Sequence, residues 1–173
     1  SLIQSNYHGI GSTLGAGSAG FFLHDRGSGF CLVPGHPNEL APGKRPLHTL
    51  SPTLWTVDDS LAMLLGTRGG DFQPQTLLQM TAFMLWANHS GTEAQVVPRW
   101  VTKEWRSGDS TIQYEPGYPA STITHLADLG HNLAATDQPM GSWGPVSAIT
   151  VADDGATYRA GDTGCPLKPG QSP

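Results

Sequence analysis

Short apolar stretches alternate with turn residues along the chain, and two of these stretches lie close together in the sequence. Residues 53–57 and 61–65 are rich in apolar and β-branched residues, and Asp58 and Asp59 separate them. Two such runs joined by a two-residue turn are typical of a β-hairpin. We therefore predict a hairpin over residues 53–65.

A longer apolar run predicts a helix over residues 74–88. Pro74 falls in the first turn of this helix, where a missing N–H costs little, and Asp71 precedes it as the expected N-terminal cap. Gly91 lies where helices commonly stop. The apolar residues cover most of the helix surface, which predicts deep burial; they are Leu77, Leu78, Met80, Phe83, Met84, Leu85 and Trp86.

Weaker patterns complete the predicted fold, which is a layered α+β arrangement because strands in hairpins alternate with buried helices. No internal repeat or linker divides the chain, so we expect one domain over residues 1–162 and a tail of junction composition over 163–173. The chain opens in what reads as the middle of a strand, which predicts a fragment of a longer protein. The remaining predicted elements are strands at 1–6, 21–23 and 110–115, helices at 93–98 and 119–129, and a hairpin of 145–151 with 156–160.

Composition excludes several functional classes. Hydrophobic residues make up 38% of the chain and charged residues 13%, which argues against disorder. The nine basic residues are scattered and the net charge is −5, so no nucleic-acid partner is expected. No apolar stretch is long enough for a membrane span. Cys31 and Cys165 are too few and too far apart to define a metal site or a disulfide framework, and we expect neither metal nor cofactor.

Two segments carry candidate chemistry. Gly69-Gly70 follows a predicted buried strand and precedes the predicted helix, where free backbone N–H groups and the helix dipole favour negative charge. A Gly-Gly pair is more often only a tight turn, so this position alone does not establish a site. The second segment, residues 44–53, reads Lys-Arg-Pro-Leu-His-Thr-Leu-Ser-Pro-Thr, in which the two cations are ordinarily solvated.

In this order and spacing, the two segments resemble the small catalytic subunit of the γ-glutamyltransferase family of N-terminal nucleophile hydrolases. The resemblance extends over residues 1–162 and implies part of an αββα sandwich. It also implies that Gly69 and Gly70 form the oxyanion hole and that the partner is the large subunit of the same self-cleaving precursor. The expected substrate is a small γ-glutamyl or related acyl amide, and no cofactor is implied.

The resemblance assigns substrate contacts residue by residue. The family's two carboxylate-binding serines correspond to His48 and Thr49, and Asn6 matches the asparagine that contacts the substrate α-amino group. The family's Gln or Glu and Asp, which bind the ammonium, correspond to Arg26 and Gly29. The acidic partner is therefore missing and a cation stands nearby, which favours a neutral or anionic acyl group over a γ-glutamyl group.

The family's nucleophile, an N-terminal threonine, is not in this chain and is expected upstream of Ser1. The supporting hydroxyl of the family falls on Gln4 by direct count, or on Ser5 with a one-residue gap. The chain alone is therefore expected to be inactive. Residues 31–41 are short where many relatives carry a lid, which favours hydrolysis over acyl transfer. Two alternatives stay open: a family member without catalysis that serves as a binding or scaffold protein, and an unrelated secreted binding module.

Overall fold

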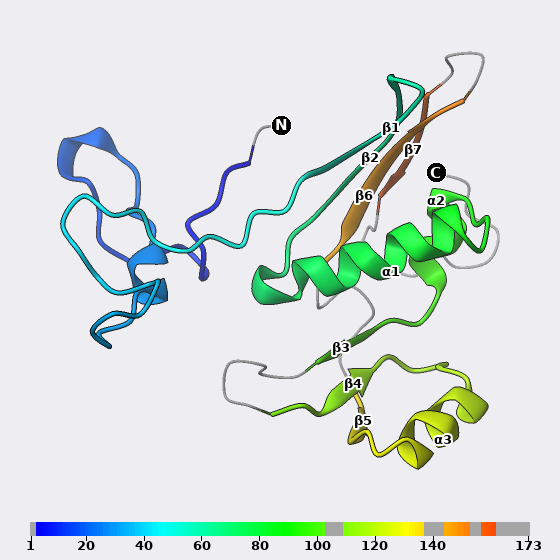
Figure 1. The fold of residues 1–173 in the computed structure, drawn as a ribbon. Coiled ribbons are helices and arrows are strands. Elements are labelled where there is room, and N and C mark those ends of the chain that lie inside the picture. The colour runs from blue at the N-terminus through cyan, green and yellow to red at the C-terminus, as the bar shows by residue number, and fades with distance from the viewer. Residues whose placement is uncertain (1–2, 103–108, 137–143, 153–156, 162–173) are drawn as a thin grey trace. The chain divides into compact units, whose positions relative to one another are not determined.

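The computed structural model describes residues 3–102, 109–136, 144–152 and 157–161 (Figure 1). The chain divides into two compact units, Ser1–Leu50 and Ser51–Pro173, each of which is described by itself. The predicted tail at residues 163–173 and the predicted turn at 153–155 lie outside the described residues.

The first unit consists mainly of loops. Its regular elements are two short 3₁₀ turns, η1 (Gly17–Ala19) and η2 (Arg26–Gly29). The predicted strand at 1–6 is wrong for its described part, since residues 3–6 take part in no β-ladder. At residues 21–23 the structure has only an isolated bridge between Gly15 and Phe22. An extended segment becomes a strand only beside a partner that takes up successive backbone groups, and the described part of this unit supplies no more than short stretches of such pairing.

The second unit contains a four-stranded antiparallel sheet in the order β1-β2-β6-β7. Its strands are β1 (Thr53–Val57), β2 (Ser60–Thr67), β6 (Val146–Val151) and β7 (Thr157–Gly161). Both predicted hairpins are confirmed. Asp58 and Asp59 connect β1 to β2 with φ angles of 48° and 61°, the left-handed backbone that a two-residue hairpin turn requires.

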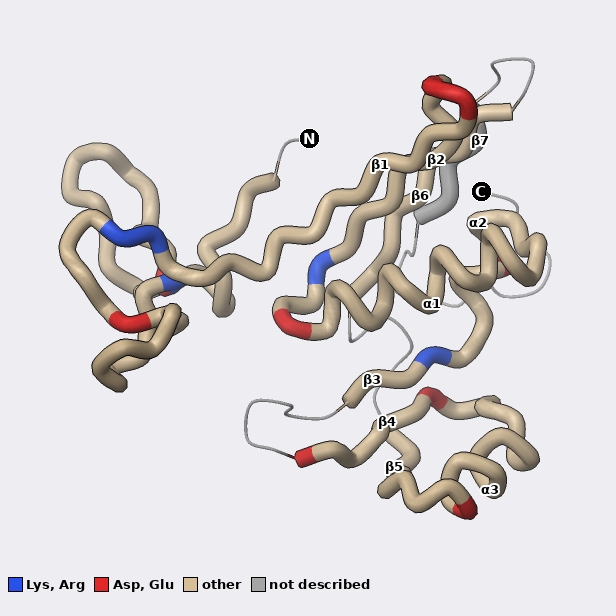
Figure 2. The backbone as a smooth tube through the Cα atoms, in the orientation of Figure 1, with Lys and Arg blue, Asp and Glu red and all other residues tan. Residues whose placement is uncertain are grey.

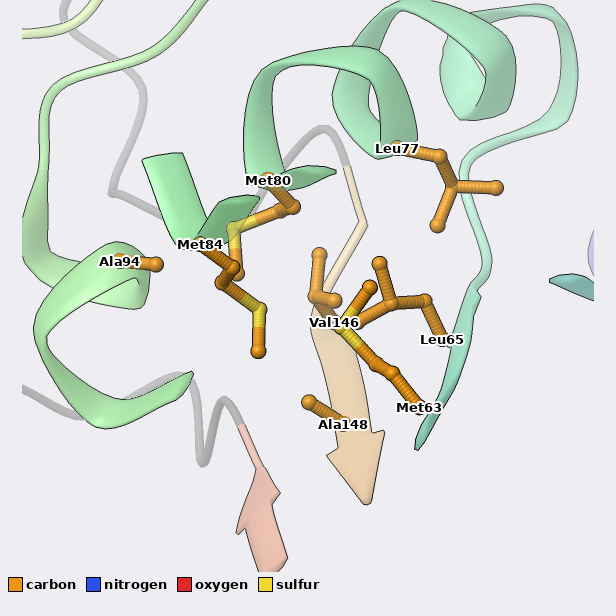
Figure 3. Packing of buried hydrophobic residues seen from close by; sticks show 8 residues of the cluster. All are labelled: Met63, Leu65, Leu77, Met80, Met84, Ala94, Val146 and Ala148. Carbon is orange, nitrogen blue, oxygen red and sulfur yellow. The ribbon is translucent and has the colours of Figure 1, made fainter. Parts of the chain in front are cut away.

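Two helices cover one face of this sheet: α1 (Gln73–Leu85), which follows the 3₁₀ turn η3 (Gly70–Phe72), and α2 (Gly91–Val96). The core forms between α1, α2, β2 and β6 (Figure 3). Its residues follow the period of each element, two along the strands and three to four along α1. They are Met63, Leu65, Val146, Ala148, Leu77, Met80, Met84 and Ala94.

The opposite face of the sheet is also apolar. Leu54, Leu64 and Ile149 are paired across β1, β2 and β6, so they form one row on the face away from the core. Leu54 is 65% exposed in this chain. A sheet that is apolar on both faces is typical of an inner layer covered on both sides.

Details of the predicted helix require correction. Pro74 does lie in the first turn of α1, but Phe72 occupies the N-cap without a side-chain cap bond, and Asp71 lies inside η3. The prediction that most of the helix surface is buried is wrong: only one face of α1 is buried, since Leu78 and Leu85 are 57% and 52% exposed. Gly91 does not end α1 but begins α2, because Ser90 and the side chain of Glu93 form a capping box there.

A second sheet has the order β3-β4-β5 and contains β3 (Trp100–Thr102), β4 (Ile112–Tyr114) and β5 (Leu133–Ala135). Strands β3 and β4 are antiparallel, whereas β4 and β5 are parallel and connected through α3 (Ala120–Asp128). The predicted strand at 110–115 and helix at 119–129 are confirmed with slightly shorter bounds. Strands β3 and β5 have three residues each and were not predicted.

We expect Ser90→Ala to lower the free energy of unfolding by about 1 kcal/mol, because the Ser90 side chain accepts a hydrogen bond from the Glu93 N–H at the start of α2. Chemical denaturation of the full-length protein measures this. Thr92→Ala, an exposed change in the same turn, is the control, and an equal effect of both variants contradicts the prediction.

The same cap predicts a pH dependence. The backbone N–H and hydroxyl of Ser90 donate to Glu93 and hold the pKa of its carboxyl below the usual value. A carboxyl whose pKa is lower in the folded state than in the unfolded state stabilises the folded protein at pH values above its unfolded pKa. This contribution disappears as the pH falls through the folded pKa. The stability difference between the unmodified protein and Ser90→Ala should therefore shrink in acid.

Candidate functional site

Arg26 joins one predicted substrate-binding residue of the first unit, Thr49, to Ser5 and Tyr7. Its Nη2 donates to Ser5 Oγ at 3.0 Å and its Nη1 to Thr49 Oγ1 at 3.5 Å. The guanidinium carbon lies 4.9 Å from the ring centroid of Tyr7, a cation–π distance. Arg26 and Thr49 are thus neighbours, and Ser5 rather than Gln4 supplies a hydroxyl beside them.

The turn that carries Asn6 and Tyr7 is held by Asp25. The backbone N–H of Asp25 donates to the Asn6 carbonyl at 3.1 Å. The Asp25 carboxylate accepts from the His8 N–H at 3.0 Å and lies 2.9 Å from His8 Nδ1. The His8 backbone bond is the main reason that the pKa of Asp25 is lowered, with the imidazole contributing further. The Asn6 side chain itself donates to the Ile10 carbonyl at 3.4 Å.

Gly29 and His48 are not joined to the Arg26 cluster by any described contact. The Gly29 carbonyl accepts a hydrogen bond from the Asn38 side chain, and a Cβ at Gly29 would lie 3.6 Å from the Leu47 carbonyl oxygen. His48 is exposed, and its Nδ1 accepts from the Leu50 N–H at 3.2 Å. The imidazole is therefore engaged with its own backbone.

Gly69 and Gly70 lie in the second unit, between the end of β2 and the start of η3. Both have positive φ angles, 127° and 56°, which residues other than glycine rarely adopt. Among the described residues, no hydrogen bond uses the backbone N–H of either glycine. The turn therefore leaves two adjacent donors available at the point where the sequence predicts an oxyanion hole.

A buried ion pair supports the chain just before this turn. Arg99 and Glu115 are 3% and 1% exposed, and Arg99 Nη2 lies 2.9 Å from Glu115 Oε1. The backbone N–H and Nε of Arg99 donate to the other carboxylate oxygen at 2.8 Å and 3.3 Å. Arg99 Nη1 also donates to the Gly144 carbonyl at 3.0 Å. The pair therefore joins β3, the end of β4 and the entry to β6.

Gly144 in turn lies against the residue that precedes Gly69. A Cβ at Gly144 would collide with the carbonyl oxygen of Arg68, and the φ of Gly144 is 124°. Thr67 Oγ1 lies 2.9 Å from the Pro145 carbonyl oxygen. The backbone leading into the two glycines is thus fixed from one side by residues 144–145.

Sequence reasoning missed this arrangement and also missed Tyr7. Arg99 and Glu115 are each the single charged residue of an otherwise uncharged segment, residues 95–101 and 110–118. That combination was the available signal for a buried pair. Nothing in the local pattern around Tyr7 marks it as a partner of Arg26.

Figure 2 shows that the charged positions of the described residues are scattered over many elements. No described helix combines the length and the apolar character that crossing a bilayer requires. Within the described ranges, no three His, Cys, Asp or Glu side chains are grouped as metal ligands would be.

Known proteins share this fold over nearly the whole chain. A gamma-glutamyltranspeptidase of Helicobacter pylori superimposes with a TM-score of 0.80 at 25% identity, covering 95% of this chain and 92% of that one. A cephalosporin acylase of Bacillus halodurans superimposes with a TM-score of 0.82 at 31% identity, covering 93% of this chain and 29% of the acylase. The fold is therefore α+β and corresponds to the small-subunit portion of the N-terminal nucleophile hydrolase αββα sandwich.

The family model for gamma-glutamyltranspeptidase matches residues 1–164. The oxamate amidohydrolase proenzyme of Klebsiella pneumoniae is 34% identical over 163 residues, and the glutathione hydrolase-like YwrD proenzyme of Bacillus subtilis is 35% identical over 163 residues. Both matches cover 94% of this chain and 31% of the relative, so the chain spans 31% of the length of these relatives. The chain belongs to the gamma-glutamyltranspeptidase family.

We expect Glu115→Gln to destabilise the protein by about 3–5 kcal/mol, because it leaves the buried Arg99 cation without its countercharge. Urea unfolding of the full-length protein measures the change. Asp59→Asn removes an exposed carboxylate from a turn that asparagine also tolerates, and it should change the stability by no more than about 0.5 kcal/mol. Similar losses for the two variants contradict the prediction.

Proposed function

We propose that this chain is the small-subunit part of an amidohydrolase that cleaves γ-glutamyl or related acyl amides. The nucleophile is an N-terminal threonine upstream of Ser1, exposed by self-cleavage of the precursor, and the chain by itself is inactive. The observation that carries the proposal is the Gly69-Gly70 turn at the start of η3, whose two left-handed residues have N–H groups that donate to no residue in the described part of the chain.

The chemistry assigned to these residues is acyl transfer through the threonine. Its hydroxyl adds to the amide carbonyl while its own α-amine accepts the proton. The carbonyl oxygen becomes an oxyanion that accepts hydrogen bonds from the N–H groups of Gly69 and Gly70. The C–N bond then breaks, the amine leaves with the transferred proton, and water hydrolyses the threonine ester to the free acid.

The proposed partner is the large subunit of the same precursor. The row of Leu54, Leu64 and Ile149 is apolar and faces away from the core, as expected for a sheet that a second layer covers. The named relatives are proenzymes about three times as long as the matched region, since the match covers 31% of each. The remaining part of such a precursor is long enough to supply that layer.

The names of the relatives support both acyl classes. One is a glutathione hydrolase-like proenzyme, and the other is an oxamate amidohydrolase proenzyme. Oxamate carries a carboxylate and no amino group on its acyl part. The replacement of the family's ammonium-binding residues by Arg26 and Gly29 fits the second class better.

The full-length protein tests the proposal directly. We expect it to cleave itself, to expose an N-terminal threonine that mass spectrometry identifies, and to release the aniline from acyl anilides. Gly69→Ala should lower kcat by roughly 100- to 1000-fold, because it disturbs an oxyanion donor at a left-handed position.

Gly15→Ala is the matched control for Gly69→Ala. Gly15 is exposed in the first unit, it is not among the glycines with a positive φ, and a Cβ there meets no atom within 4 Å. We expect its kcat to change by less than about threefold, as for a substitution without strain. A full-length sequence without threonine at the cleavage site, or equal losses for the two variants, contradicts the proposal and favours a non-catalytic binding protein.

A second expectation concerns the acyl acceptor. The segment 31–41 is short and closes on itself, with the Cys31–Glu39 bridge and Lys44 donating to the carbonyls of Pro37 and Glu39. An acyl-enzyme without a long lid is open to water. We expect free acid to exceed transfer product when a dipeptide acceptor is added at modest concentration, and product analysis by chromatography measures the ratio. An excess of transfer product contradicts the expectation.

A further inference from the structure

Arg26 is the one described residue of the first unit that is buried, with 9% of its surface exposed. Apolar residues of the same unit are exposed to solvent; for example, Leu32 is 82% exposed and Leu14 is 63% exposed. Burial of a cation is costly unless an anion compensates it. A loop unit that buries its arginine in preference to its leucines is therefore organised around that charge.

The described partners of Arg26 do not neutralise it. Ser5 and Thr49 offer hydroxyl oxygens at 3.0 Å and 3.5 Å, and Tyr7 offers a ring face. A guanidinium has five N–H donors in a planar fork, and these neutral groups use only two of them. No described carboxylate forms an ion pair with Arg26, since the adjacent Asp25 is engaged by His8.

The surroundings orient the guanidinium rather than saturate it. Tyr7 has a φ of 80°, an uncommon backbone conformation for a tyrosine, and its N–H donates to Ser5 Oγ at 3.1 Å. Ser5 Oγ therefore accepts from both Tyr7 and Arg26, which leaves its own hydroxyl hydrogen available for a further oxygen. Thr49 likewise accepts from Arg26 and retains a hydrogen to donate.

We propose that Ser5, Tyr7, Arg26 and Thr49 form a carboxylate subsite, and that the preferred acyl group carries a free carboxylate and no amine. This inference rests on the proposed function, of which it specifies the substrate class. A carboxylate can accept from the guanidinium fork and from the two hydroxyls together. An α-ammonium beside the same carboxylate would face the Arg26 cation and, at position 29, a glycine in place of an acid.

The test compares three anilides with the self-cleaved full-length protein. Glutaryl anilide carries the carboxylate alone, γ-glutamyl anilide carries the carboxylate and the ammonium, and butyryl anilide carries neither. We expect kcat/KM for glutaryl anilide to exceed both others by at least about tenfold, because only this substrate satisfies the cation without repulsion.

Two variants separate recognition from folding. Arg26→Gln should lower kcat/KM for glutaryl anilide roughly a hundredfold and thereby remove most of its advantage over butyryl anilide. Arg26→Lys keeps the charge but not the fork and should recover part of the glutaryl preference. Complete self-cleavage and an unchanged circular-dichroism spectrum show that each variant is folded and processed.

Several results overturn the inference. These are faster turnover of γ-glutamyl than of glutaryl anilide by the unmodified protein, equal losses for glutaryl and butyryl anilide in Arg26→Gln, and no loss in that variant. Failure to turn over any anilide contradicts the proposed function instead. In that case, calorimetry with glutarate tests the carboxylate subsite. Glutarate binding to the unmodified protein that is lost in Arg26→Gln supports the subsite, and absence of glutarate binding to the unmodified protein overturns it.

Discussion

The carboxylate of Glu115 and the guanidinium of Arg99 lie together in the interior of the second unit, and each makes the burial of the other tolerable. Neither residue belongs to the apolar core between α1, α2 and the four-stranded sheet. Because Arg99 also holds the Gly144 carbonyl, the pair connects the small sheet to the strand entry beside Arg68. The Gly69-Gly70 turn thus lies beside this electrostatic contact, in addition to being held between β2 and α1, which pack in the apolar core.

The first unit is organised differently. In its described part no apolar side chain is buried, and its loops are held by hydrogen bonds such as those from His8 to Asp25 and from Lys44 to two carbonyls. Such a unit lacks the buried apolar area that ordinarily offsets the conformational entropy of a chain this long. Its stability must come from surfaces beyond its own residues, which agrees with a chain that spans 31% of its relatives.

Sequence patterns predicted the helices and strands that are determined by residues close together in the sequence. The hairpin around Asp58 and the helix beginning near Pro74 are encoded by turn chemistry and apolar period, and both were confirmed. Strands β3 and β5 were missed because three residues carry too little pattern and their pairing is set by distant neighbours. Gly91 was misread because the capping box of Ser90 and Glu93 overrides the usual preference of glycine for a helix end.

The candidate site shows the same limit. The family resemblance pointed to Arg26, Thr49 and the two glycines, because each corresponds to one position of a short family segment. It did not indicate that Arg26 is buried on Tyr7, nor that Arg99 pairs with Glu115, because both facts depend on contacts between distant segments. The roles of all the predicted site residues remain predictions from the family resemblance; they are Asn6, Arg26, Gly29, His48, Thr49, Gly69 and Gly70.

The four-stranded sheet with two apolar faces has a consequence for assembly. In the precursor that we propose, the layer that covers Leu54 and Leu64 would be present at the high local concentration that a covalent connection provides. The proposed self-cleavage would remove this connection after folding. Reassembly of separated, denatured subunits would then be a bimolecular process that dilution slows, so the proposed mature protein would persist through slow dissociation rather than through easy refolding.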